Sequence, residues 1–216
     1  KFASNIEFYL MKQAKTSKAW MKEHVNDFFV KQSKKDGYRS RAAYKLIEIS
    51  ERDQILKPGM TVVDLGAAPG SWSQVANHIV GAKGKVIALD ILDMPPLPGV
   101  EFIRHDFREE CAVIELNNLL NGCQPDIVIS DMSPNISGIV VSDQAKSMYL
   151  AELALTFSIE QLNYDGSFLV KVFQGRDFDQ FMRQMRTAFK KVMVRKPKAS
   201  RDRSNELYLL GLGKKK

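Results

Sequence analysis

Three charged residues lie where buried strands are expected, and their types suit proton transfer or the stabilisation of a developing charge. Lys171 lies within the apolar run FLVKVF, Asp131 follows another apolar run in SDMSPN, and Glu206 begins the run ELYLL. An unpaired ammonium in such surroundings is costly, so Lys171 is expected to have a carboxylate partner. A purely structural ion pair is the alternative, but a position at a ligand cleft favours a catalytic role.

A second group of residues predicts a pocket for a nucleoside. In DLGAAPGSW, small residues fill the turn between a strand ending in Asp64 and a helix, so a ligand can approach the backbone closely. The next expected strand ends in Asp90, which suits a ribose diol, and the third ends near Asp106, which suits an adenine amine. Aspartates at strand ends also cap turns. Three at successive strand ends favour binding of a cofactor.

The glycine-rich turn also excludes two common cofactors. It has neither the GxGxxG spacing of a dinucleotide site nor the GK[ST] ending of a P-loop. Neither a nicotinamide cofactor nor ATP is favoured.

The elements that must position these residues alternate between strand and helix patterns. The sequence predicts strands over 61–66, 85–91, 101–107, 126–132, 167–173, 191–197 and 206–213. It predicts helices over 38–54, 71–80, 109–120, 143–162 and 177–189. This order is typical of an α/β fold with a doubly wound, mostly parallel seven-stranded sheet that ends in an antiparallel edge hairpin. Ligands of such sheets bind beyond the carboxyl ends of the strands.

Length and composition favour a single domain over residues 1–216. Within it we expect a catalytic core over 56–213, preceded by a basic helical segment over 17–55 in which Arg41 and Lys45 share one helix face. Residues 1–16 are expected to be either flexible or an expression remnant, and no function is assigned to them.

Charge is strongly segregated along the chain. Residues 1–45 hold 11 Lys/Arg against 4 Asp/Glu, residues 46–182 hold 9 against 19, and residues 183–216 hold 12 against 2. Basic ends around an acidic middle favour a polyanionic partner, although any single lysine is better explained as a solvated surface residue. Phosphate contacts are expected from the basic stretches 31–45 and 183–203, including Arg195, with Tyr38 or Tyr44 available to stack a base.

Several classes of protein are disfavoured. No stretch approaches the roughly 20 apolar residues of a membrane span, so we expect a cytoplasmic protein without membrane association. No metal site and no disulfide framework are expected, because two cysteines and three histidines are scattered along the chain. These are Cys111, Cys123, His24, His78 and His105.

Four motifs together, RSRAAYKL, DLGAAPGSW, SDMSPN and VKVFQG, resemble the FtsJ family of ribosomal RNA ribose methyltransferases. The resemblance spans about residues 17–213 and implies a Rossmann-like, class I S-adenosylmethionine-dependent fold. It also implies a catalytic set of Lys45, Asp131, Lys171 and Glu206. The cofactor implied is S-adenosyl-L-methionine, with contacts from Gly70, Trp72, Asp90, Asp106 and Asp131. Ser71 departs from the pattern, in which a second glycine is common, but serine suits the start of a helix.

The resemblance implies methylation of a ribose 2′-hydroxyl in RNA, most directly a uridine of 23S rRNA in the large ribosomal subunit, with no obligate protein partner. Transfer RNA is an alternative substrate. A base or protein methyltransferase on the same fold is disfavoured by the Lys171 and Glu206 pairing. A non-catalytic RNA-binding ribosome-assembly factor is a further alternative, and its signature would be broken catalytic positions.

Lys171 could act in methyl transfer in either of two ways. The family pattern assigns it the proton of the ribose hydroxyl, which requires a neutral amine acting as general base. Alternatively, Lys171 stays charged and stabilises the developing alkoxide. The amino-acid sequence does not choose between them.

Overall fold

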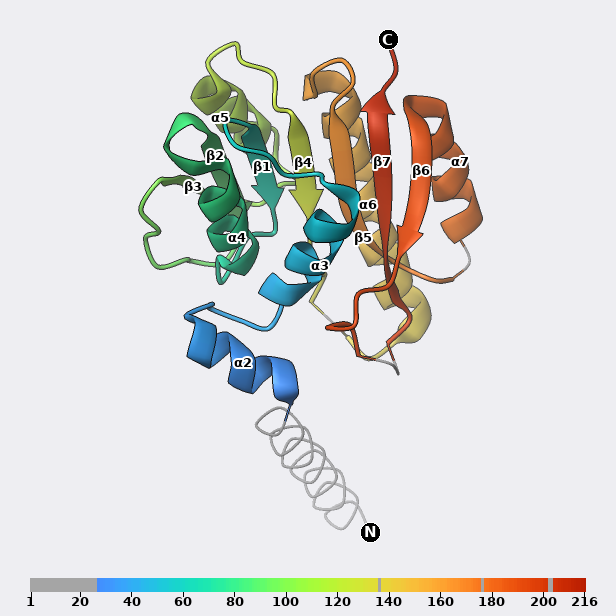
Figure 1. The fold of residues 1–216 in the computed structure, drawn as a ribbon. Coiled ribbons are helices and arrows are strands. Elements are labelled where there is room, and N and C mark those ends of the chain that lie inside the picture. The colour runs from blue at the N-terminus through green and yellow to red at the C-terminus, as the bar shows by residue number, and fades with distance from the viewer. Residues whose placement is uncertain (1–26, 136, 176, 202–203) are drawn as a thin grey trace.

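The computed structural model describes residues 27–135, 137–175, 177–201 and 204–216, which form a seven-stranded sheet with helices on both faces (Figure 1). The strands are β1 (Thr61–Leu65), β2 (Lys85–Asp90), β3 (Val100–Arg104), β4 (Ile127–Ser130), β5 (Ser167–Phe173), β6 (Phe189–Arg195) and β7 (Glu206–Lys214). The helices are α2 (Phe28–Asp36), α3 (Ala43–Asp53), α4 (Ser71–Val80), α5 (Glu110–Leu120), α6 (Val140–Gln161), α7 (Phe178–Ala188) and the 3-10 turn η1 (Gly81–Lys83).

The sheet has the spatial order β3-β2-β1-β4-β5-β7-β6. Strands β1 to β5 pair in parallel, whereas β7 runs antiparallel to both β5 and β6 and lies between them. The predicted doubly wound sheet with an antiparallel hairpin is therefore confirmed, with strand ends shifted by a few residues. Because β7 is reversed, its first residue lies at the edge where β1, β4 and β5 end.

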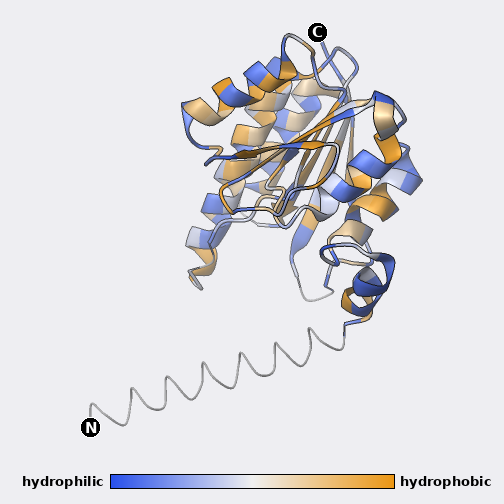
Figure 2. Ribbon diagram, turned by 90° about the vertical axis from the view of Figure 1, so that its left-hand side faces the viewer, coloured by the Kyte–Doolittle hydropathy of each residue, from blue (hydrophilic) through white to orange (hydrophobic). Residues whose placement is uncertain are grey.

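Alternation along the strands divides the core between the two faces of the sheet. Val63 and Leu65 pack with the helices α5, α6 and α7 on one face. Val62 packs with α3 and α4 on the other, because successive side chains of a strand point to opposite sides. Figure 2 shows the apolar strands enclosed between these helical layers. Both faces of the sheet are thus buried. The ends of the strands remain accessible to ligands.

The chain ahead of the sheet differs from the prediction. Helix α2 was not predicted, yet it has clear end signals: the Asp27 side chain accepts from the backbone N–H groups of the first turn, and Gly37 ends the helix at a φ of 77°. The single helix expected over 38–54 is wrong at its start, since α3 begins at Ala43 and Arg41 lies in the preceding turn. Arg41 pairs with Asp27 and the carbonyl of Ala199 and does not share a helix face with Lys45.

The expected N-terminal segment 1–16 and the beginning of the basic segment 17–55 lie outside the described residues. None of the described helices combines the length and apolar character needed to cross a membrane.

Candidate active site

The ammonium of Lys171 is buried beside Asp131. Lys171 projects from β5 on the face covered by α3 and α4, and Asp131 follows the neighbouring strand β4. The Lys171 Nζ atom lies 2.6 Å from the Asp131 carbonyl oxygen and 3.2 Å from Asp131 Oδ1, and the lysine side chain is 7% exposed. Lys171 therefore has the carboxylate partner that its apolar flanks required.

A second ion pair joins helix α3 to strand β7. Lys45, in the first turn of α3, places Nζ 2.7 Å from Glu206 Oε1. Glu206 is the first residue of β7 and also accepts a 2.8 Å hydrogen bond from Ser200 Oγ. Lys196 holds the loop from the outside by donating to the carbonyl oxygens of Ser204 and Glu206. The loop between β6 and β7 thereby fixes one of the two carboxylates.

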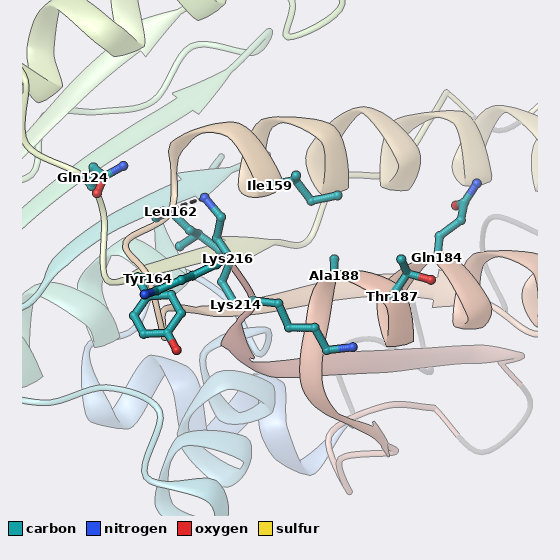
Figure 3. A pocket seen from close by; sticks show the side chains of 10 residues that line it. Gln124, Ile159, Leu162, Tyr164, Gln184, Thr187, Ala188, Lys214 and Lys216 are labelled. Atoms are coloured by element: carbon teal, nitrogen blue, oxygen red, sulfur yellow. Dashed lines mark hydrogen bonds between the residues drawn. The ribbon is translucent and has the colours of Figure 1, made fainter.

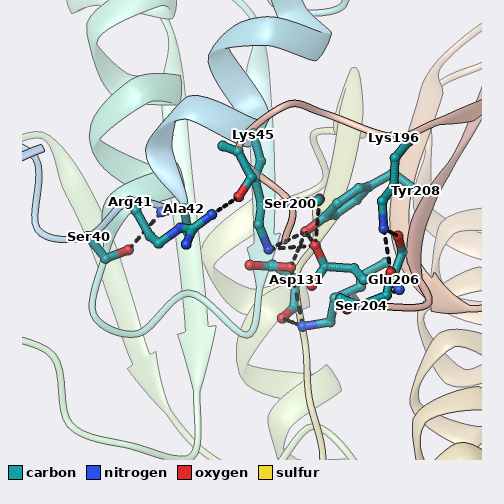
Figure 4. Close-up of polar contacts among 12 residues, drawn as sticks. Ser40, Arg41, Ala42, Lys45, Asp131, Lys196, Ser200, Ser204, Glu206 and Tyr208 are labelled. Atoms are coloured by element: carbon teal, nitrogen blue, oxygen red, sulfur yellow. Dashed lines mark hydrogen bonds and ion pairs between the residues drawn. The ribbon is translucent and has the colours of Figure 1, made fainter. Parts of the chain in front are cut away.

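Tyr208 connects the two ion pairs (Figure 4). Its hydroxyl lies 2.7 Å from Asp131 Oδ1 and 3.3 Å from Glu206 Oε1, and it accepts a 3.0 Å hydrogen bond from Lys45 Nζ. Tyr208 is fully buried and pairs in register with Lys171 across β5 and β7. The sequence reasoning missed it, although its position two residues after Glu206 in a strand puts both side chains on one face. These five residues are called the Lys171–Tyr208 network below.

The charges of this network keep Asp131 ionised. Burial alone would raise the pKa of Asp131, but the nearby Lys171 and Lys45 ammoniums, with hydrogen bonds from Tyr208 and Lys171, hold that pKa below its ordinary value. Burial, reinforced by the carboxylates of Asp131 and Glu206, raises the pKa of Tyr208 well above its usual range. At neutral pH the network therefore combines an ionised Asp131 with a neutral phenol.

The glycine-rich turn after β1 lies at the same edge of the sheet. Gly70 caps α4 at a φ of 102°, a conformation that favours glycine. A Cβ atom there would lie 2.6 Å from Arg39 Nη1 and 2.7 Å from Met94 Sδ. The Ser71 hydroxyl lies 2.7 Å from that of Ser40, so the serine that departs from the family pattern ties α4 to the segment before α3.

Two predicted cofactor residues lie at the ends of the neighbouring strands. The Asp90 carboxylate accepts hydrogen bonds from the backbone N–H groups of Ala68, at 2.9 Å, and Leu92, at 2.8 Å. Asp106, just beyond β3, pairs with Arg108, and hydrogen bonds from that guanidinium hold the pKa of Asp106 below its ordinary value. Both carboxylates are hydrogen-bond acceptors at the carboxyl edge, beside the turn that contains Gly70.

Trp72 occupies a different place from the other predicted cofactor residues. Its side chain is 2% exposed, donates from Nε1 to the carbonyl of Ala42 at 2.9 Å, and packs against the ring of Tyr208. The indole thus belongs to the core under α3 and α4. A ligand at the turn can meet Trp72 through the backbone at the beginning of α4.

Asp64 was noted in the sequence only as the end of the first strand, but its environment is unusual. The side chain is fully buried, Oδ2 accepts a 2.7 Å hydrogen bond from Ser73 Oγ, and Oδ1 has no partner among the described residues. Burial, together with the carboxylates of Asp131 and Asp90, raises the pKa of Asp64 to about 7 despite the Ser73 hydrogen bond. Asp64 Oδ1 is therefore a buried acceptor without a described partner, and it lies on β1 just before the glycine-rich turn.

Arg195 is not available for the predicted phosphate contact. Its guanidinium makes two 2.6 Å hydrogen bonds to the carboxylate of Asp53 at the end of α3, and both side chains are largely buried. The Tyr44 hydroxyl donates to Asp36 at 2.6 Å, and stacking of a base on its ring stays a prediction. In contrast, three lysines on α2 are exposed: Lys31, Lys34 and Lys35.

The structure also brings together residues that the sequence left apart. Cys111 Sγ lies 3.8 Å from His105 Nδ1 and 3.5 Å from Glu109 Oε2 on the surface where β3 leads into α5. His105 and Cys111, which were described as scattered along the chain, thus lie close together in space, since only a short segment separates β3 from α5. That the chain has no metal site stays a prediction.

A groove of about 660 Å³ lies at the opposite edge of the sheet (Figure 3). It is formed by the end of α6, by α7 and by the last residues of β7, and its described lining has no carboxylate. It is therefore separate from the Lys171–Tyr208 network.

A doubly wound sheet with a glycine-rich turn after β1 and acidic residues at the ends of β2 and β3 defines a Rossmann-like α/β class of protein, whose ligands lie at the carboxyl ends of the strands. The chain belongs to the FtsJ-like methyltransferase family, whose sequence profile matches residues 38–214. The predicted family resemblance is confirmed.

Individual relatives agree with this membership. The chain is 65% identical over 205 residues to the ribosomal RNA large subunit methyltransferase E of Nitrosospira multiformis, covering 95% of this chain and 100% of the relative. It is 63% identical to the protein of the same name from Methylobacillus flagellatus, covering 94% and 98%. A Plasmodium falciparum crystal structure titled as a ribosomal RNA methyltransferase superposes with a TM-score of 0.73 at 31% identity, covering 82% of this chain and 98% of that one.

Proposed function

We propose that this protein methylates a ribose 2′-hydroxyl of RNA with S-adenosylmethionine, and that its substrate is a uridine of 23S rRNA in the large ribosomal subunit. The single observation that carries the reaction type is the Lys171–Asp131 ion pair, joined through Tyr208 to Lys45 and Glu206 beside the glycine-rich turn. The names of the relatives support the ribosomal substrate. The reaction would then take place in the cytoplasm, without an obligate protein partner.

The residues at the carboxyl edge fit S-adenosylmethionine. Gly70 and the backbone of Trp72 would line its approach to the turn, Asp90 would accept from the ribose diol, and Asp106 would accept from the adenine amine. Asp64 Oδ1, which lacks a partner among the described residues, and the ionised Asp131 offer acceptors for a cationic group. When bound, the cofactor supplies a methyl group that its sulfonium has already activated.

The remaining catalysis is a matter of orientation and charge. The two contacts of Lys171 Nζ with the carbonyl and carboxylate of Asp131 use two N–H donors. In a neutral amine, the lone pair would remain for the proton of the ribose hydroxyl; in an ammonium, the third N–H would remain for the developing alkoxide. The geometry accommodates both roles, and Asp131 fixes the direction of Lys171 in either case.

Transfer of a labelled methyl group tests the proposal. The purified protein is incubated with labelled S-adenosylmethionine and with large ribosomal subunits, free 23S rRNA or transfer RNA, and the modified nucleotides are mapped. We expect 2′-O-methyluridine in 23S rRNA. Label confined to transfer RNA would overturn the substrate, and methylated bases would overturn the reaction. Binding of RNA without turnover would favour an assembly factor.

A further inference from the structure

The loop between β2 and β3 is short of backbone donors. It contains the sequence MPPLPG, in which Pro95, Pro96 and Pro98 have no N–H group. The carbonyl oxygen of Leu97 accepts from the N–H group of Val100 at 3.0 Å, but the three prolines leave few donors within the stretch for its other carbonyl oxygens. Stability of the loop therefore depends on donors from other segments of the chain.

Arg39 supplies most of those donors. Its guanidinium donates to the carbonyl oxygen of Pro95 at 2.8 Å and to that of Pro96 at 2.9 Å, while Asn77 donates to the carbonyl of Pro98 at 3.0 Å. Arginine has five donors in a rigid plane and no acceptor, so it complements the proline carbonyl oxygens of this loop. A lysine ammonium cannot reproduce this planar arrangement.

The same guanidinium reaches the glycine-rich turn. Arg39 Nη1 donates to the carbonyl oxygen of Pro69 at 3.0 Å and lies over Gly70, where a Cβ atom would approach it to 2.6 Å. One side chain thus joins the loop after β1 to the loop after β2. These two loops carry the predicted cofactor residues Gly70 and Asp90.

The backbone beside Arg39 is fixed to the helix that follows the turn. The N–H group of Arg39 donates to Gln74 Oε1 at 2.8 Å, and Gln74 Nε2 donates to the carbonyl of Gly37 at 3.1 Å. The hydroxyl contact between Ser40 and Ser71 adds a further tie. Arg39 is therefore fixed both at its backbone and at its guanidinium, so it is not a freely moving surface residue.

The two loops are also joined from the inside. Asp90 accepts from the backbone of Ala68 in one loop and of Leu92 in the other. Met94 is buried with Ala67 in a small apolar cluster between the same loops. Arg39 and Asp90 therefore each form hydrogen bonds to both loops, Arg39 to their carbonyl oxygens and Asp90 to their N–H groups.

We propose that Arg39 is a positioning residue for the methyl donor: it holds the loops after β1 and β2 at the separation that the donor requires. This inference rests on the proposed function, because it assumes that the donor binds between Gly70 and Asp90. Arg39 acts through the backbone of the two loops, and the Lys171–Tyr208 network is left unchanged by its removal.

Calorimetric titration with S-adenosylhomocysteine tests the inference on the full chain. We compare the wild type with Arg39→Gln, Arg39→Lys and a matched control, Arg52→Gln, at an exposed position of α3. We expect the Kd of both Arg39 variants to rise by about tenfold or more and that of the control to stay unchanged. In turnover, the KM for S-adenosylmethionine should rise similarly while kcat at saturating donor changes by less than about twofold.

Hydrogen exchange of the donor-free proteins separates this inference from the proposed function. Amides of residues 91–99 should exchange faster in the Arg39 variants than in the wild type. Unchanged donor affinity in both Arg39 variants, or a loss confined to RNA affinity, would overturn the inference. A wild type that fails to bind S-adenosylhomocysteine would overturn the proposed function instead, and faster exchange would then still support the joining of the two loops.

Discussion

The hydroxyl of Tyr208 donates to Asp131 Oδ1 across 2.7 Å, and this bond links β7 to the loop that follows β4. Because Lys45 donates to the same hydroxyl, the two ion pairs of the site are parts of one buried polar network. Such networks are strongly interdependent at low dielectric, so a change in one member is expected to affect the others.

Removal of that hydroxyl is the most direct test of the network. We expect Tyr208→Phe to lower kcat by about tenfold to a hundredfold, because a hydrogen bond to a charged group contributes about 1.5–3 kcal/mol. Donor affinity should change less than kcat, since Tyr208 lies on β7 and Asp131 keeps its contact with Lys171 in the variant. Single-turnover methylation and calorimetry measure the two effects, with Tyr164→Phe, an exposed tyrosine, as the matched control. Full activity in Tyr208→Phe would show that the ion pairs act independently.

Substitution of Lys171 distinguishes its two possible roles. Lys171→Met removes the amine with little change in side-chain length and should lower kcat by about 10²- to 10⁴-fold, the usual contribution of a general base. It also leaves Asp131 without its nearest counter-charge, so the melting temperature should fall and must be measured alongside.

Lys171→Arg provides the comparison that Lys171→Met cannot. A base mechanism predicts that the arginine variant is as inactive as the methionine variant and that the pH dependence of the single-turnover rate disappears. Substantial activity in Lys171→Arg, independent of pH, would instead support a charged residue that stabilises the alkoxide.

Asp64 should make stability depend on pH in an unusual direction. Its pKa of about 7 in the folded protein exceeds the ordinary value of 3.8, so between these values the unfolded chain has lost a proton that the folded chain retains. Stability then falls as pH rises from about 4 to about 7 and levels off above. For Asp64→Asn, the unfolding free energy relative to wild type should rise across this window, by at most about 4 kcal/mol.

Urea unfolding at several pH values measures this difference. Asp93→Asn, at an exposed position of the loop after β2, is the control. Parallel stability curves for Asp64→Asn and wild type would show that Asp64 is ionised in the folded protein. The variant should also bind S-adenosylhomocysteine less tightly, if the donor uses the acceptor at Oδ1.

Lysines on α2 should contribute to RNA affinity. Lys31, Lys34 and Lys35 are exposed on a helix at the carboxyl edge of the sheet (Figure 1). Their combined replacement by alanine should weaken RNA binding and lower the slope of log K against log salt by up to about 3, since each phosphate contact contributes roughly 0.7–0.9. Replacement of Lys215 and Lys216, at the opposite edge, is the control. An unchanged slope would remove α2 from the RNA footprint.

Arg195 should behave as a structural residue. Removal of one partner from a buried ion pair leaves an uncompensated charge, so Arg195→Met should lower the unfolding free energy by about 3–5 kcal/mol. The salt dependence of RNA binding, measured on the folded fraction, should not change. A weaker salt dependence at unchanged stability would restore the phosphate contact that the sequence predicted.

The strands of the fold could be predicted because they are short, mostly apolar runs between turn-forming residues, and their mostly parallel pairing followed from the alternation with helices. The ion pair of Lys171 could be predicted because burial of an unpaired ammonium in an apolar strand costs a large free energy. In contrast, α2 has only a weak apolar pattern, and its boundaries depend on the local geometry at Asp27 and Gly37.

Residues that act through contacts distant in sequence could not be predicted. Arg39 meets its proline carbonyls only after β1 and β2 lie side by side, and Arg195 meets Asp53 only when β6 reaches the end of α3. At Arg195, basic composition therefore indicated a phosphate contact where the structure has an ion pair with Asp53. The burial of Asp64 likewise depends on the whole sheet. Tyr208 is intermediate, since strand periodicity places it beside Glu206 but does not indicate its bond to Asp131.

The insertion of β7 between β5 and β6 has a consequence for how the enzyme can be altered. The residues proposed for the donor lie after β1, at the end of β2 and after β3, whereas the proposed acceptor chemistry depends on β5 and β7 in the other half of the sheet. Asp131, which follows the central strand β4, is the residue that we propose for both the donor and the acceptor chemistry. Substitutions in one half can therefore tune cofactor affinity independently of turnover, whereas a change at Asp131 should affect both. The sheet thus separates cofactor affinity from turnover, so that mutation and selection could modify each of them independently.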